Sequence, residues 1–139
     1  MPSMFNKPTA TLISEPAYFG LSTNLMILSD KNYDLRYILS IINSKFALDW
    51  FYKNGKKRGV GIDIGVGKLR LFPIKIADKD KQKSLIEMVD KILAITKTED
   101  YLDNPAKQEK VKEYENKIDQ MVYKLYDLTP EEIKIVEAK

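Results

Sequence analysis

The densest group of residues able to do chemistry is a cationic, glycine-rich stretch near the middle of the chain. Between Lys53 and Arg70, six positive residues stand against one acid, Asp63, so this stretch carries +5. The whole chain carries +3, which leaves −2 for the remainder. Five of the six glycines fall in the same region. Because glycine lets the main chain approach a ligand closely, and lysine and arginine neutralise phosphates, this composition indicates binding to a polyanion.

The spacing of the glycines argues against the common nucleotide-binding loops. A Walker A loop needs a glycine five residues before its Gly-Lys pair, and Gly67-Lys68 has Ile62 in that position. The dinucleotide pattern also fails, since Gly59 and Gly61 would require a third glycine at position 64, which is isoleucine. An ordinary solvated loop is the alternative interpretation, because lysine and glycine are common in loops.

The residues of this stretch suit two kinds of contact with nucleic acid. The cations can neutralise phosphates, and the arginines, together with Asn54 and Tyr52, can reach base edges. The predicted DNA-binding residues are Asn54, Lys56, Lys57, Arg58, Gly59, Lys68 and Arg70.

The chain contains no cysteine and no histidine. This removes disulfides, thiol nucleophiles, Cys/His zinc sites and the Ser-His-Asp triad. Acid–base catalysis would fall to carboxylates, lysine or tyrosine, which need burial to titrate near neutral pH. We therefore predict no catalytic residue, no metal site and no cofactor in these residues.

Two acidic groups imitate metal sites without meeting their requirements. Glu132 and Lys134 match the Glu-x-Lys end of a nuclease site, but Glu132 is better placed to cap a short terminal helix. Glu99, Asp100 and Asp103 lack the glycine and terminal glutamate of a calcium loop, so we interpret them as a solvated linker.

Three consecutive aromatic residues, Trp50, Phe51 and Tyr52, suggest a stacking platform for single-stranded bases. Aromatic side chains at helical spacing beside Phe46 more often belong to a core. We favour the core for Trp50 and Phe51 and leave Tyr52 open.

The N-terminal quarter has the pattern of strands. At 139 residues and 44% hydrophobic content, the chain is long and apolar enough for one domain with a core. Residues 9–14 and 18–29 are predicted strands, joined as a hairpin through residues 15–17. The second strand alternates Leu25, Ile27 and Ser29 against Asn24, Met26 and Leu28. After the glycine-rich loop, with a short ribbon around residues 60–66, residues 68–76 continue as an extended or short helical segment.

Helical periodicity dominates the rest of the chain. A first helix begins at Asp34 and is predicted to lie on the sheet, and Ser44 caps a second that stops at Gly55. Residues 80–127 form two helices with one apolar seam, the second beginning at Pro105, and Thr129 caps a last one. The predicted fold class is α+β: a small mixed or antiparallel sheet with packed helices, followed by an antiparallel helical hairpin. We place a boundary between residues 1–78 and 79–139.

Three stretches together resemble one protein family. YDLRYILSIINSKFALDWFYKNGKKRG and LFPIKIADKDKQKSLIEMVDKIL are similar to segments of restriction-modification specificity domains. IDQMVYKLYDLTPEEIKIVE resembles the end of TaqI-like C-terminal specificity domains, which are related to type I specificity subunits. The resemblance covers residues 18–137, and its last stretch is the most distinctive.

The resemblance implies recognition of a duplex DNA target for an adenine methyltransferase/endonuclease. It implies that Lys56, Lys57 and Lys68 contact phosphates, whereas Arg58 or Arg70 donates to guanine. The Asn-Pro-Pro-Tyr signature of the methyltransferase is absent. S-adenosylmethionine and Mg²⁺ are therefore expected only in the rest of the parent enzyme, whose catalytic domain would be the protein partner.

The competing interpretation is a protein-interaction or dimerisation module that acts through the helical hairpin without binding DNA. A homodimer through these helices is the corresponding partner. No apolar run approaches the ~18–20 residues needed to span a bilayer, and the first residues lack a secretory signal pattern. We therefore expect a cytoplasmic protein without a membrane partner.

Overall fold

The computed structural model describes residues 4–5, 9–18, 20 and 23–139. Within them the chain is mostly helical with one small antiparallel sheet, which confirms the predicted α+β class. The sheet has the strand order β1-β3-β2. The elements are β1 (Met4–Phe5), α1 (Leu35–Ile42), α2 (Lys45–Asn54), β2 (Lys56–Arg58), β3 (Gly61–Asp63), α3 (Val66–Leu69), α4 (Lys79–Thr96), η1 (Tyr101–Asp103), α5 (Pro105–Leu125) and α6 (Pro130–Glu137).

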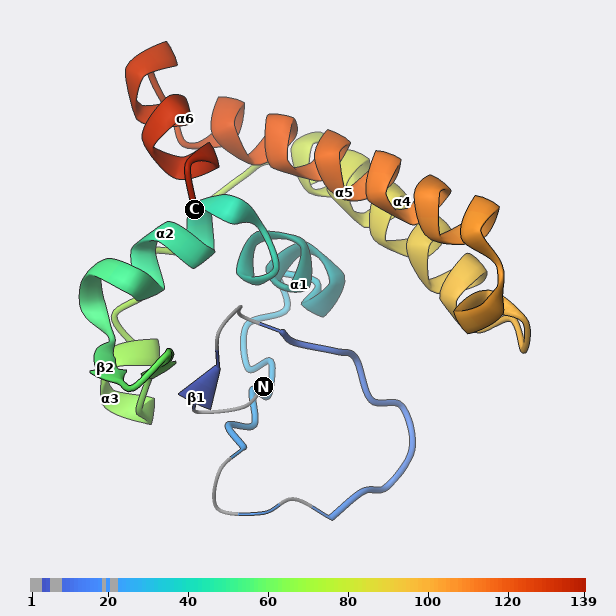
Figure 1. Ribbon diagram of the computed structural model, residues 1–139, viewed down its shortest axis with the longest axis horizontal. Helices are drawn as coiled ribbons and strands as arrows, with labels where there is room; N and C mark the ends of the chain where they lie inside the picture. The colour runs from blue at the N-terminus through green and yellow to red at the C-terminus, as the bar shows by residue number, and fades with distance from the viewer. Residues whose placement is uncertain (1–3, 6–8, 19, 21–22) are drawn as a thin grey trace.

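Helices α4 and α5 form the predicted antiparallel hairpin, which lies across one side of the molecule in Figure 1. The Asp78 side chain caps α4 by accepting from the Lys81 amide at 2.8 Å. Asn104 caps α5, whose first residue is Pro105, as the missing amide of proline at this position predicts. The caps therefore define the helix starts that the sequence predicted.

Ser44 caps α2 as predicted, and Asp34, where the first helix was predicted to begin, caps α1. The prediction that the first helix lies on the sheet is wrong, because α1 packs against α4, α2 and α5. Its most buried apolar residues are Tyr37, Ile41 and Ile42. Since helices approach α1 from more than one side, burial extends beyond a single apolar stripe.

One continuous core joins the two parts of the chain on either side of residue 78. Its members come from helices α1, α2, α4 and α5, from β3, and from the segments just before and after α3. The domain boundary at residue 78 stays a prediction. Residues from both sides of it pack in the same core. The buried residues of this core are Tyr37, Ile41, Ile42, Ala47, Phe51, Ile62, Ile64, Phe72, Leu85, Val89, Ile118 and Val122.

The two predicted N-terminal strands and their hairpin do not form in the described residues. Residues 9–14 are irregular, and the described part of residues 18–29 contains only an isolated bridge at Thr23. Residues 19, 21 and 22 of that prediction lie outside the described residues. Of the two alternating sets, Asn24 is buried, whereas Leu25 and Ile27 are exposed. Alternation of side-chain types predicts a segment with two different faces. A strand also needs backbone hydrogen bonds to a neighbouring strand, and the sheet of this protein is built from other segments.

Helix α6 closes the C-terminal end beside α2, as Figure 1 shows. Thr129 and Glu132 form the predicted capping box, in which each side chain accepts from the backbone amide of the other. Glu132 thus serves as a cap, which confirms the interpretation drawn from the sequence.

Candidate nucleic-acid interface

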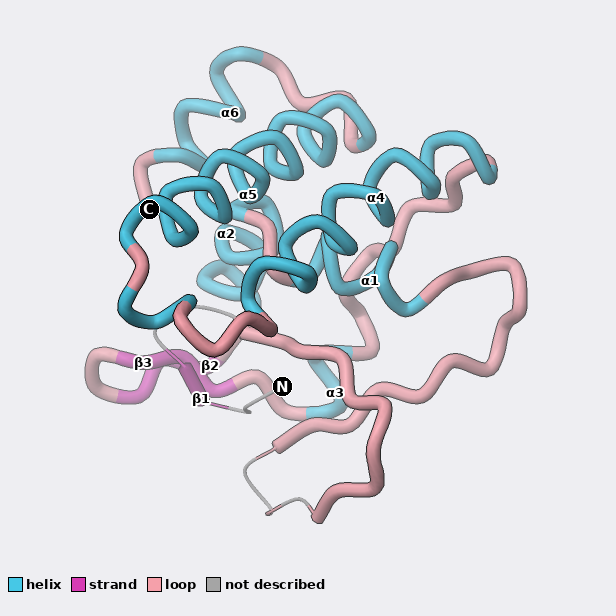
Figure 2. Tube along the Cα trace, turned by 90° about the vertical axis from the view of Figure 1, so that its right-hand side faces the viewer, coloured by secondary structure: helices cyan, strands magenta, loops and turns pink. Residues whose placement is uncertain are grey.

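The glycine-rich stretch folds as a β-hairpin rather than as an open loop. Strands β2 and β3 pair antiparallel with Lys56 opposite Asp63, Lys57 opposite Ile62 and Arg58 opposite Gly61. The strands begin earlier than the predicted ribbon around residues 60–66. In Figure 2 the tip of this hairpin projects away from the helices.

The turn of the hairpin consists of two residues, Gly59 and Val60. Gly59 has a φ of 57°, a left-handed conformation that favours glycine. Glycine at the first position of a two-residue loop is typical of the tight turns whose twist matches paired strands. Gly59, which the sequence nominated for close approach to DNA, therefore also sets the turn. Val60 beside it is 90% exposed at the tip of the turn.

The base of the hairpin is fixed to the core by two isoleucines. Ile62 is 2% exposed and Ile64 is fully buried. The Asn24 amide donates to the main-chain carbonyl of Ile64 at 3.1 Å, and β1 pairs with the other edge of β3. These contacts hold the cationic strand on a rigid base. The role of Asn24 was not predicted, because its partner is forty residues away in the sequence.

The cations of β2 all point into solvent. Lys56, Lys57 and Arg58 are exposed, and only Arg58 has an ion pair with a described residue, Asp63, at 3.1 Å. Lys57 shares a face with the buried Ile62, whereas Lys56 and Arg58 lie on the opposite, outer face with Asp63. Both faces of the ribbon therefore present positive charge.

The remaining predicted DNA-binding residues lie elsewhere. Lys68 belongs to the short helix α3 and Arg70 caps its end, and both are exposed. Figure 2 shows α3 apart from the hairpin tip, so the cations form two groups on the surface. Asn54, at the end of α2, is partly buried and donates its amide to the Trp50 carbonyl at 2.8 Å. That bond occupies one of its two amide hydrogens.

Trp50 and Phe51 pack in the core, as predicted. Phe51 is fully buried, and Trp50 packs edge-on against Phe51 and Phe72 at ring distances of 5.6 and 5.2 Å. Tyr52 is partly buried, with the Lys139 ammonium 5.7 Å from the centre of its ring. Trp50 and Phe51 therefore serve packing.

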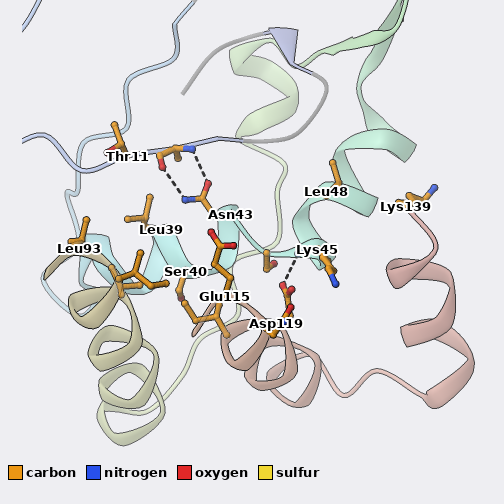
Figure 3. A pocket seen from close by; sticks show the side chains of 16 residues that line it. Thr11, Leu39, Ser40, Asn43, Lys45, Leu48, Leu93, Glu115, Asp119 and Lys139 are labelled. Carbon is orange, nitrogen blue, oxygen red and sulfur yellow. Dashed lines mark hydrogen bonds between the residues drawn. The ribbon is translucent and has the colours of Figure 1, made fainter. Parts of the chain in front are cut away.

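A cavity of about 350 Å³ opens between the N-terminal segment, α1, the start of α2 and the α4–α5 hairpin, as shown in Figure 3. The Asn43 side chain exchanges two hydrogen bonds with the backbone of Ala10, at 2.8 and 2.9 Å. The Asp119 carboxylate accepts from the Lys45 amide at 2.8 Å. The Asn43 and Asp119 side chains therefore connect chain segments across the cavity wall. The polar groups that would bind a ligand are already used in these bonds.

Among the acidic residues between α4 and α5, Asp100 contacts neighbouring side chains. Asp100 pairs with Lys107 and accepts from the Asn104 side chain at 2.9 Å; the Lys107 ammonium first, and then the Asn104 amide, lower the pKa of the Asp100 carboxyl from 3.8 to about 2. No group of three or more His, Cys, Asp or Glu side chains in the described part of the chain is arranged to hold a metal ion.

No helix in that part has the length and apolar character needed to cross a membrane.

Comparison of the chain with protein families, with curated proteins and with solved structures yields no match.

Proposed function

We propose that this chain is the DNA target recognition domain of a restriction-modification enzyme and binds duplex DNA through the β2–β3 hairpin. The observation that carries the proposal is the fixed, projecting hairpin with three consecutive exposed cations, Lys56, Lys57 and Arg58. A major groove about 12 Å wide admits a two-stranded ribbon of this kind. The restriction-modification context is supported by the resemblance of three sequence stretches.

In this proposal some residues of the hairpin and of α3 contact phosphates, and one contacts a base. Lys56, Lys57 and Lys68 contact phosphates and position the protein, whereas an arginine reads a base. No chemical step occurs in these residues. The methyltransferase/endonuclease part of the parent protein would supply the reaction, together with S-adenosylmethionine and Mg²⁺.

The alternative, an interaction or dimerisation module, would use the surface of the helical hairpin. The seam residues Leu85, Val89, Ile118 and Val122 are buried in the core. Helices α4 and α5, both described throughout, carry none of the strongly exposed large apolar side chains. This distribution favours the DNA-binding proposal.

The proposal is tested by titrating a labelled duplex with the full chain at several salt concentrations. Each phosphate contact that is lost reduces the slope of log K against log salt by about one. The double variant Lys56→Ala, Lys57→Ala is therefore expected to lower the slope by about two. The matched control is Lys83→Ala, Lys124→Ala, which removes the same charge from exposed positions on α4 and α5.

A control variant that retains the wild-type slope would support binding through the hairpin. Equal slopes for both double variants would contradict it, since net charge alone would then explain the binding. A chain that binds no duplex at low salt would overturn the proposal and leave the interaction module as the better interpretation.

A further inference from the structure

We propose that Arg58 reads a guanine in the major groove and that Asp63 is the positioning residue that holds Arg58 for this contact. The inference rests on the proposed DNA-binding function and adds which of the two arginines reads the guanine and which residue positions it. It starts from the ion pair between the Arg58 Nε and the Asp63 Oδ2, at 3.1 Å.

The register of the hairpin explains how the pair forms. Arg58 lies opposite Gly61 and diagonal to Asp63 on the outer face of the ribbon. Diagonal neighbours across an antiparallel pair are within reach of long side chains. Because Gly61 has no side chain, nothing opposite Arg58 blocks its path toward the carboxylate.

The bond from Arg58 Nε to Asp63 leaves the edge of the guanidinium that carries the two Nη atoms free to bind a base. Asp63 occupies the Nε–H, and no other hydrogen bond joins the Arg58 side chain to the described residues. A guanidinium carries five N–H donors in a rigid plane, so its far edge still offers one N–H from each Nη. Two parallel donors on one edge match the O6 and N7 acceptors that guanine presents in the major groove.

Phosphate binding alone does not explain a carboxylate at position 63. Asp63 is the one acid among the six cations between residues 53 and 70, and it opposes attraction to a polyanion. A half-exposed pair of this kind contributes little to stability. Its benefit is to order a long, flexible side chain before binding, which lowers the entropy cost of the contact.

The second candidate arginine lacks this support. Arg70 is exposed at the end of α3, and no described carboxylate lies within ion-pair distance of it. It can contact a phosphate, which makes no demand on orientation. The structure therefore assigns base reading to Arg58 and makes Arg70 a matched control.

The test selects duplexes that the full chain enriches from a pool with a randomised central segment. In the enriched duplex, each guanine is then replaced by 7-deazaguanine, which lacks the N7 acceptor. For the wild-type chain, one replacement is expected to weaken binding measurably, but by less than the roughly 5- to 150-fold of a whole bidentate contact, because the O6 acceptor remains. Arg58→Ala removes every donor from this side chain and should abolish that loss, whereas Arg70→Ala should retain it.

Two variants of Asp63 separate positioning from charge. Asp63→Ala removes both the acceptor and the negative charge, so the chain should bind unrelated duplexes more tightly while its guanine preference disappears. Asp63→Asn removes the charge but keeps an oxygen that can accept from Nε, so its guanine preference should survive. A purely structural role for Asp63 would not divide the two variants in this way.

Each result decides between the two proposals. Salt-dependent binding with no guanine preference, or with a preference that Arg58→Ala or Asp63→Ala leaves intact, overturns this inference and leaves the proposed function standing. Absence of salt-dependent duplex binding overturns both. Circular dichroism spectra that match the wild type establish that each variant is folded.

Discussion

Gly55 and Ile62 are in such close contact that no side chain fits between them. A Cβ added to Gly55 would lie 2.3 Å from Ile62 Cγ2 and 2.8 Å from the Phe51 carbonyl oxygen. Gly55 has a φ of −79°, so its backbone conformation is open to any residue. The need for glycine at the end of α2 thus comes from the close approach of the hairpin, not from a left-handed helix cap.

We predict that Gly55→Ala displaces the hairpin from α2. Overpacking of this kind costs about 1–3 kcal/mol, and the displacement should also weaken duplex binding, because the cations lose their rigid base. Urea denaturation and duplex titration measure the two effects. The control is Gly65→Ala, since a Cβ at Gly65 meets no atom within 4 Å. Equal stability of the two variants would show that the contact with Ile62 does not constrain the hairpin.

Tyr126 is predicted to stabilise the segment that follows α3. Its hydroxyl donates to the Pro73 carbonyl at 2.5 Å and accepts from the Lys75 amide at 3.1 Å. Tyr126→Phe keeps the ring stacked on Phe46 but removes both bonds, and should lower the free energy of unfolding by about 1–2 kcal/mol. Tyr18→Phe, at a fully exposed position, should leave that free energy unchanged in the same denaturation experiment. A Tyr126→Phe variant as stable as Tyr18→Phe would rule out this role.

Alkaline pH should destabilise the fold through three tyrosines that are buried or partly buried. Burial raises the pKa of Tyr37, Tyr123 and Tyr126 above the ordinary value of 10.0. The folded state therefore holds these protons more tightly than the unfolded state, so their contribution is fully present below about pH 10 and is lost as pH rises further. Thermal unfolding followed between neutral pH and pH values above about 10 should show a falling Tm. Tyr123→Phe should flatten that fall, and an unchanged pH dependence in this variant would exclude the assignment.

The helix boundaries could be predicted because they depend on residues close together in the chain. Asp34, Ser44, Asn104 and Thr129 each accept a hydrogen bond from an amide two or three residues ahead. Such bonds form within one turn, so the sequence contains all the information that they require. The prediction of the cationic stretch had the same local basis.

The errors concern partners that are distant in sequence. The segment at residues 24–29 alternates like a strand, yet β3 pairs with β1 and β2 instead. The prediction that the first helix lies on a sheet failed because α4, more than thirty residues further on, packs against that helix. Periodicity identifies which residues seek burial, but not the element that buries them.

The sequence by itself determined the charge of the hairpin, the capped helices and the absence of thiol and imidazole chemistry, because these follow from residue types and short-range hydrogen bonds. Only the tertiary structure decided that Arg58 is paired with Asp63, that Lys68 and Arg70 lie apart from the hairpin tip, and that Gly55 is required by Ile62. Those relationships depend on strand register and on the packing of the hairpin against α2, which are set by long-range contacts.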